Sequence, residues 1–217
     1  MERAGQAAFD VAQQAYPDSR HWLVACGGGN NGGDGYVVAR LAKASGRQVT
    51  LVTQGNQSAL PEEARQAQAD WLAAGGDIQV ESGYWPADVD LIIDGLLGTG
   101  IRNAPRAPVS DIIVQINQHP APVIALDIPS GLVADSGAIP GVAVSATHTV
   151  TFIALKPGLL TGKAREVVGR LHYHALGLES WLAMQTAAPV QRFDAQNLAQ
   201  WLMPRRPTAH KGDHGRL

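Results

Sequence analysis

The sequence has 217 residues, of which 45% are hydrophobic and 17% charged, and this composition suits one globular domain with a substantial core. A net charge of −2 and a pI of about 6.4 supply no clustered basic face for nucleic acid or anionic lipid. One cysteine, Cys26, excludes a disulfide framework within the chain, and no run approaches the ~20 apolar residues of a membrane span. We therefore expect a cytoplasmic protein that binds neither nucleic acid nor a membrane.

Apolar runs and helical patterns alternate along the chain. In chain order, the patterns that predict helices cover residues 1–16, 35–45, 61–74 and 109–117. The runs that predict strands are, in chain order, HWLVACG, QVTLVTQ, DIQVES, VDLIIDGLLG, PVIALDIPSG, HTVTFIAL and VGRLHYHAL. The last two runs predict later strands, with an edge of the sheet as one possible place for them. This order of elements is typical of an α/β protein.

The strands LIID and VIAL are apolar at consecutive positions, not at alternate ones. Such runs indicate burial on both faces, as in a parallel sheet covered by helices on each side. The sequence therefore predicts a three-layer, doubly wound, mainly parallel sheet of the Rossmann-like type. In such sheets, ligands bind beyond the carboxyl ends of the strands, where the strand order reverses.

The stretch CGGGNNGGDGYVVAR, residues 26–40, is unusually rich in glycine, which is costly to order and so indicates positive φ angles or a closely approaching ligand. Gly27, Gly29 and Gly32 match the G-x-G-x-x-G pattern of dinucleotide sites. An NAD-dependent redox enzyme would also have an acidic residue about 20 positions later, where this chain has Val-Thr-Gln at 52–54. The Walker pattern and the G-x-S-x-G elbow are also missing, which argues against NTPases and serine hydrolases.

Polar side chains follow three of the predicted strands, and we expect them to meet in one crevice. The first strand is followed by Asn30, Asn31 and Asp34, a later one by Asp94, and the next by Asp127 and Ser130. For Asp34, the two alternatives are a helix N-cap alone and an N-cap that also contacts a ligand, and the two asparagines also suit a turn.

Asp94, Ser130 and one asparagine would provide only oxygen ligands, which a hard cation prefers. The alternative is that Asp94 accepts hydrogen bonds from backbone amides of the GLLGTG turn. Asp127, in an apolar crevice, is our candidate for general acid–base chemistry.

Other polar residues are weaker candidates. His172 and His174 lie two residues apart, but no third ligand accompanies them, so a metal site is not expected. Lys156 and Lys163 could meet a phosphate at the same crevice. The favoured interpretation of both is a solvated loop lysine.

Four motifs together carry a family resemblance: CGGGNNGGDGYVVAR, DLIIDGLLGTGI, VIALDIPSGL and TFIALKPGLLTGKA. In this order and spacing they resemble the NAD(P)H-hydrate epimerase family, the YjeF N-terminal domain, over most of the chain. The closing PTAHKGDHGRL resembles the opening of the ADP-dependent NAD(P)H-hydrate dehydratase domain of bifunctional members. The resemblance implies an epimerase domain over 1–203, without the upstream helical segment common in the family. It also implies that 204–217 are a linker and the start of a dehydratase domain.

The resemblance further implies interconversion of the R and S forms of hydrated NADH or NADPH, a bound potassium ion, a homodimer and a fused dehydratase domain. By motif, Asn31, Asp94 and Ser130 would ligate potassium. The substrate would contact Asn30, Asn31, Gly32, Gly33, Asp34, Gly98, Thr99, Gly100, Ile101, Arg102, Asn103, Ala104 and Asp127. Our mechanistic hypothesis makes Asp127 the acid and base of the reaction. The alternative is a noncatalytic nucleotide-binding or interaction module of the same fold.

Overall fold

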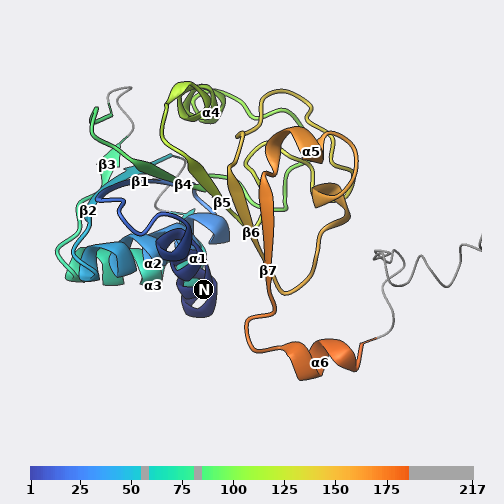
Figure 1. Cartoon of the computed structure of the whole chain (residues 1–217), viewed down its shortest axis with the longest axis horizontal. Coiled ribbons are helices and arrows are strands. Elements are labelled where there is room, and N and C mark those ends of the chain that lie inside the picture. The colour runs from blue at the N-terminus through green and yellow to red at the C-terminus, as the bar shows by residue number, and fades with distance from the viewer. Residues whose placement is uncertain (55–58, 81–84, 186–217) are drawn as a thin grey trace, which may run out of the picture. The chain divides into compact units, whose positions relative to one another are not determined.

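The central sheet of the described residues has seven strands, all parallel, in the order β3-β2-β1-β4-β5-β6-β7 (Figure 1). The structure is a computed structural model that describes residues 1–54, 59–80 and 85–185. The strands are β1 (His21–Cys26), β2 (Gln48–Thr53), β3 (Gln79–Val80), β4 (Leu91–Gly95), β5 (Val123–Leu126), β6 (His148–Phe152) and β7 (Arg170–His174). The predicted parallel α/β sheet is confirmed, and β7 forms one edge.

Helices cover both faces of this sheet (Figure 1). They are α1 (Glu2–Ala15), α2 (Asn30–Ala44), α3 (Glu62–Ala73), α4 (Val109–Gln118), the 3-10 helix η2 (Pro157–Leu159), α5 (Ala164–Val167) and α6 (Glu179–Ala183). Helices α1, α2 and α3 pack on one face and α4 on the other. None of the helices among the described residues is both long and apolar enough to cross a bilayer.

Strand β1 shows why its sequence is apolar at consecutive positions. Trp22 and Val24 belong to the core cluster under α1, α2 and α3, whereas Leu23 and Ala25 belong to the cluster under α4. Because successive side chains of a strand point to opposite faces, both faces of β1 need apolar residues. The pattern predicted from the sequence is therefore the consequence of two hydrophobic layers.

The strand order reverses between β1 and β4. From β1 the chain proceeds through β2 to β3 on one side, and then returns to place β4 on the other side of β1. The loop after β1 and the loop after β4 therefore begin side by side at the carboxyl edge, where Cys26 pairs with Gly95. This is the position at which sheets of this type bind ligands.

The predicted start of α2 is wrong. The helix begins at Asn30, with Gly29 in the N-cap position, and not at Gly35. The glycine-rich stretch is thus largely the first turns of a helix, although glycine is a poor helix former. The other predicted helices agree with α1, α3 and α4 to within a few residues. The predicted boundary between 203 and 204 lies outside the described residues.

Candidate active site

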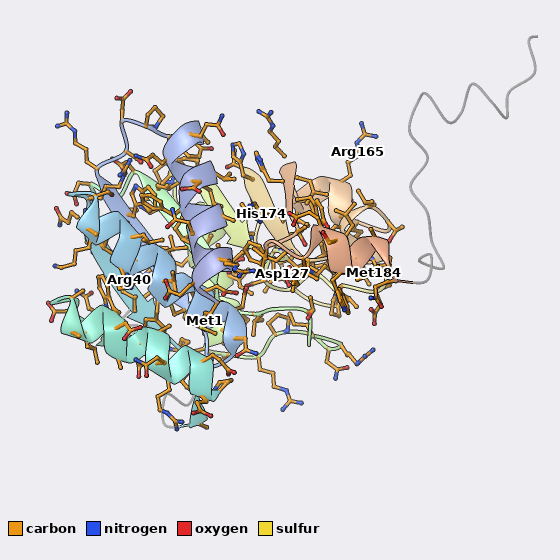
Figure 2. The ribbon with its side chains drawn as sticks, turned by 90° about the horizontal axis from the view of Figure 1, so that it is seen from below. Met1, Arg40, Asp127, Arg165, His174 and Met184 are labelled. Atoms are coloured by element: carbon orange, nitrogen blue, oxygen red, sulfur yellow. The ribbon has the colours of Figure 1, made fainter. Side chains whose placement is uncertain are left out.

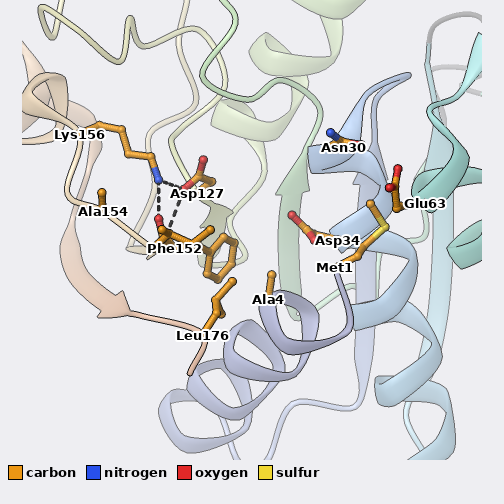
Figure 3. Close-up of a pocket in the computed structure, with 11 residues that line it drawn as sticks. Met1, Ala4, Asn30, Asp34, Glu63, Asp127, Phe152, Ala154, Lys156 and Leu176 are labelled. Atoms are coloured by element: carbon orange, nitrogen blue, oxygen red, sulfur yellow. Dashed lines mark hydrogen bonds and ion pairs between the residues drawn. The ribbon is translucent and has the colours of Figure 1, made fainter. Parts of the chain in front are cut away.

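Two adjoining cavities open at the carboxyl edge of the sheet. The acidic cavity, of about 520 Å³, is lined by Met1, Ala4, Asn30, Asp34, Glu63, Asp127, Phe152, Ile153, Ala154, Lys156 and Leu176 (Figure 3). Two of these residues, Met1 and Asp127, are also labelled in the view of the whole chain in Figure 2. The glycine-loop cavity, of about 470 Å³, is lined by Gly28, Gly29, Asn30, Asn31, Asp34, Leu96, Leu97, Gly98, Thr99, Gly100 and Asp127. Asn30, Asp34 and Asp127 line both cavities, so these residues mark where the two meet. Each volume falls in the range of small-molecule sites.

Asp127 follows β5 and is held rigidly on one wall. Its φ angle is 62°, and the Ile128 amide donates to the Leu126 carbonyl at 2.7 Å, which is the pattern of a γ-turn centred on Asp127. Its Oδ1 accepts hydrogen bonds from Thr151 Oγ1 and from the Phe152 amide, each at 3.2 Å. The backbone thus accepts an unfavourable conformation that points a fixed carboxylate into the cavity.

Lys156 forms an ion pair with this carboxylate (Figure 3). Its ammonium also donates to Thr151 Oγ1 at 3.1 Å and to the Phe152 carbonyl at 2.9 Å. Only 18% of its side chain is exposed, and 19% of that of Asp127. The interpretation of Lys156 as a solvated loop lysine is therefore wrong. Lys163, in contrast, is exposed and is not among the residues lining either cavity.

Asp34 lies on α2, on a different wall from Asp127, and its carboxylate points toward the space between them (Figure 3). It is in the second turn of the helix, so the N-cap interpretation is wrong. Burial raises the pKa of its carboxyl from 3.8 to about 7; the N-terminal ammonium group opposes this effect and the charge of Asp127 adds to it. Among the described residues, no side chain or backbone group donates a hydrogen bond to Asp34. A carboxyl group whose pKa lies near neutrality thus faces the cavity.

Asp94 lies in β4 and is completely buried. Its carboxylate accepts hydrogen bonds from Ser130 Oγ at 2.6 Å, from the Ser130 amide at 2.8 Å and from the Leu96 amide at 3.2 Å. Burial raises its pKa to about 6, against the lowering effect of these hydrogen bonds. The alternative interpretation, in which Asp94 accepts hydrogen bonds from backbone amides of the GLLGTG turn, holds for the Leu96 amide. The hydrogen bonds from Ser130 connect the loop after β5 to Asp94.

Asn31 is linked to Ser130 through the backbone of Leu97. Its Nδ2 donates to the Leu97 carbonyl at 2.9 Å, and the Leu97 amide donates to Ser130 Oγ at 2.8 Å. Asn31 is 8% exposed, yet its buried Oδ1 has no hydrogen-bond partner among the described residues. A buried carbonyl oxygen without a donor is costly, and a cation would satisfy it. The oxygen of Asn31 is therefore of the type that a hard cation accepts.

Most glycines of the loop are required by packing within the chain. A side chain at Gly27 would clash with the Leu96 carbonyl, and one at Gly32 would clash with the Gly27 backbone. Gly33 faces Met1 and Ala64 instead of a cavity. Gly29, in contrast, has open space where a side chain would be. The loop is thus rich in glycine chiefly because α2 begins very close to two strand ends. Access for a ligand explains only part of this composition.

Only the first part of the predicted substrate segment 98–104 lines a cavity. Gly98, Thr99 and Gly100 line the glycine-loop cavity. Ile101, Arg102, Asn103 and Ala104 are not among the residues lining either cavity, and Arg102 pairs with Asp135 at 3.4 Å on the surface. Gly32 and Gly33 are likewise not among the lining residues.

His172 and His174 have different hydrogen-bond partners. His172 Nε2 lies 2.8 Å from His148 Nδ1, and His174 Nδ1 accepts a hydrogen bond from the Leu176 amide. In the part of the chain that the structure describes, no group of three histidine, cysteine or carboxylate side chains could hold a metal.

The sequence of the chain matches a known protein family and its members. The model described as "YjeF-related protein N-terminus" matches residues 1–158. The bifunctional NAD(P)H-hydrate repair enzyme Nnr of Escherichia coli (strain K12) is 63% identical over 217 residues, which are 100% of this chain and 42% of that protein. The NAD(P)H-hydrate epimerase of Limosilactobacillus fermentum is 42% identical over 174 residues, which are 79% of this chain and 82% of that protein.

A solved structure supports the fold. The crystal structure of yeast ynu0, YNL200c, superposes with a TM-score of 0.67 at 21% identity, and the match covers 80% of this chain and 76% of that one. This chain spans well under half the length of the bifunctional E. coli relative. The family match covers most of the chain and includes the glycine-rich stretch, Asp94 and Asp127. The chain therefore belongs to the YjeF-related protein N-terminus family.

Proposed function

We propose that this chain interconverts the R and S epimers of hydrated NADH and NADPH, and so contributes to the repair of damaged nicotinamide nucleotides. The names of the E. coli and L. fermentum relatives support this activity, and the second relative matches along most of its own length. The observation that carries the proposal is the junction of the two cavities at Asn30, Asp34 and Asp127. One cavity offers acid–base groups for a reacting ring, and the other offers loop amides for a phosphate-bearing remainder.

The chemistry of the proposed substrate is within reach of these groups. The hydrated ring carries a hydroxyl on the carbon beside the ring nitrogen. When an acid protonates that hydroxyl, the nitrogen lone pair expels water and leaves an iminium ion. A second water can then add to either face while a base removes its proton. Asp127 would exchange these protons, and Lys156 would act as a positioning residue that holds the carboxylate.

We also propose that potassium binds at the oxygen group formed by Asn31, Asp94 and Ser130. The unpartnered Oδ1 of Asn31 supports this site, as does the absence of nitrogen or sulfur ligands from the set. When bound, the ion would fix the loops after β1, β4 and β5 against one another and add positive charge beside the glycine-loop cavity. Its effect on rate would be electrostatic and positional.

The test uses pure R-hydrate of NADH with the purified chain, with epimer composition followed by NMR. The expected result is conversion to an R/S mixture much faster than without protein, and faster in potassium than in sodium at equal ionic strength. Asp111→Asn is the matched control, because Asp111 is an exposed carboxylate on α4 that lines neither cavity. Binding of the hydrate without conversion would instead favour the noncatalytic nucleotide-binding module.

The bifunctional relatives suggest a wider context. Because this chain aligns with 42% of the E. coli repair enzyme, we propose that it works together with a second, dehydratase domain that consumes one of the two epimers. The predicted homodimer and the cytoplasmic location remain predictions. Sedimentation of the purified chain would test the first.

A further inference from the structure

Asp127 can serve only one face of a ring bound in the acidic cavity. Its carboxylate is fixed by the γ-turn, by two hydrogen bonds to Oδ1 and by the ion pair with Lys156. Epimerisation, however, requires water to leave from one face of the ring and to add to the other. Either the ring turns over in the cavity, or a second acid–base group acts from the opposite side.

Asp34 has the position that a second group needs. It comes from α2, whereas Asp127 comes from the end of β5, and both line the acidic cavity and the glycine-loop cavity. Figure 3 shows the two carboxylates on separate walls, with the carboxylate of Asp34 directed toward the intervening space. No hydrogen bond or ion pair from the described residues occupies Asp34, so its oxygens are available to a ligand.

The electrostatic environments of the two acids differ as well. Asp127 has an ion-pair partner in Lys156, whereas Asp34 forms no ion pair among the described residues and interacts with the N-terminal ammonium only at longer range. Burial raises the pKa of Asp34 to about 7, and the nearby charge of Asp127 contributes to this increase. Two carboxyl groups in unlike environments are a common way to obtain one proton donor and one acceptor at neutral pH.

We propose that Asp34 and Asp127 act on opposite faces of the hydrated nicotinamide ring, so that epimerisation proceeds by proton donation from one wall and proton removal at the other. This inference rests on the proposed function. In one direction Asp34 protonates the hydroxyl, the carbon–oxygen bond breaks, and water leaves with the bonding electrons while the nitrogen lone pair forms the iminium. A second water adds from the other face, the iminium electrons return to nitrogen, and the water proton passes to Asp127. One proton moves from Asp34 to Asp127, and solvent returns it.

The reverse direction uses the same residues in exchanged roles. The epimer whose hydroxyl faces Asp127 is protonated there, and Asp34 then removes the proton from the incoming water. Each carboxylate is therefore specific for one epimer in the step that breaks the carbon–oxygen bond. This specificity distinguishes a mechanism with an acid–base group on each wall from a mechanism in which one carboxylate does both tasks.

The experiment measures oxygen exchange and inversion separately. Pure R-hydrate and pure S-hydrate are each incubated with the 217-residue chain and potassium in H₂¹⁸O, and NMR and mass spectrometry follow configuration and label. Asp34→Asn should slow epimerisation by about 100-fold or more, since acid–base groups typically contribute at least this much. It should still allow label to enter one epimer with retained configuration, because Asp127 can expel and restore water on its own face. Asp127→Asn should show the same behaviour with the other epimer.

The controls separate the possible failures. Asp111→Asn should behave like the wild type, and samples without protein give the background exchange. If Asp34→Asn slows exchange of both epimers equally, or leaves epimerisation near the wild-type rate, the two-wall mechanism is overturned. If the wild type neither inverts nor labels either epimer, the proposed function itself fails. Circular dichroism of each variant verifies folding, and Asp34→Glu, which keeps a carboxyl on the same wall, should recover part of the inversion rate lost in Asp34→Asn.

Discussion

Replacing Asp34 with asparagine should stabilise the folded chain, and the gain should increase with pH. Burial raises the pKa of Asp34 from 3.8 to about 7 in the folded protein, so the folded state holds this proton more tightly than the unfolded chain does. As pH rises above 3.8, the unfolded chain ionises first, and stability falls until the folded state also ionises near pH 7. An asparagine has no proton to lose, so this part of the pH dependence disappears.

The size of the effect follows from the two pKa values. A tenfold change in an ionisation constant corresponds to about 1.4 kcal/mol, so ionisation at Asp34 costs about 2 kcal/mol of folding free energy at pH 5 and about 4 kcal/mol at pH 8. The advantage of Asp34→Asn over the wild type should therefore increase by about 2 to 3 kcal/mol between these pH values. A constant offset from the amide itself does not affect this difference.

Urea unfolding at equilibrium, measured at several pH values from 5 to 8, gives the free energy of unfolding of both proteins. Groups that do not interact with Asp34 titrate alike in the wild type and the variant, so their contributions cancel in the comparison. Asp111→Asn, which replaces an exposed carboxylate on α4, is the matched control in the same measurement. If the difference in unfolding free energy between Asp34→Asn and the wild type does not depend on pH, the Asp34 carboxyl ionises normally in the folded protein. The electrostatic argument for Asp34 as the second acid–base group would then lose its support.

Three further outcomes are expected. Lys156→Met, which keeps a long side chain, should lower kcat for epimerisation by about 100-fold with a smaller change in KM. The reason is that the substitution removes the ion pair that holds the Asp127 carboxylate but leaves the carboxylate itself in place. Initial-rate kinetics would test this. Gly27→Ala should destabilise the fold by about 3 kcal/mol or more in urea unfolding, because the new methyl group would clash with the Leu96 carbonyl. His172→Gln should lose less stability than the wild type between pH 7.5 and 5.5. Burial, and then neighbouring basic groups, lower the pKa of this histidine below 6.5, so the unfolded chain takes up the proton first as pH falls; urea midpoints at both pH values would show it.

The sheet could be predicted from the sequence because its signals are local. Runs such as LIID are apolar at consecutive positions, as a strand buried on both faces requires. The position of the cavities followed from the same reasoning, since polar residues after β1, β4 and β5 must come together at one edge. The start of α2 could not be predicted in this way, because glycine lowers helix propensity. In this helix, close packing against Gly27 and Ala64 requires glycine at positions 32 and 33.

The role of Lys156 could not be predicted because it depends on contacts between residues distant in the sequence. Its partner, Asp127, lies 29 positions earlier, and its other acceptors are Thr151 and the Phe152 carbonyl. Pairing of β5 with β6 brings these segments together, and the register was not available from the sequence. The one usable signal was that HTVTFIAL also ends at the carboxyl edge, so a lysine just beyond it belonged among the candidates.

The backbone at Asp127 gives independent support for a functional carboxylate. A φ angle of 62° costs an ordinary L-residue roughly 1–2 kcal/mol, whereas glycine adopts it freely. Asp127→Gly should therefore be more stable than Asp127→Ala by about 1 kcal/mol in urea unfolding. Both variants remove the carboxylate and leave Lys156 without it, so that loss cancels between them. Equal stabilities would mean that the γ-turn holds no strain. A glycine advantage would show that the chain keeps an aspartate where a residue without a side chain folds better, as expected when the side chain is retained for its chemistry.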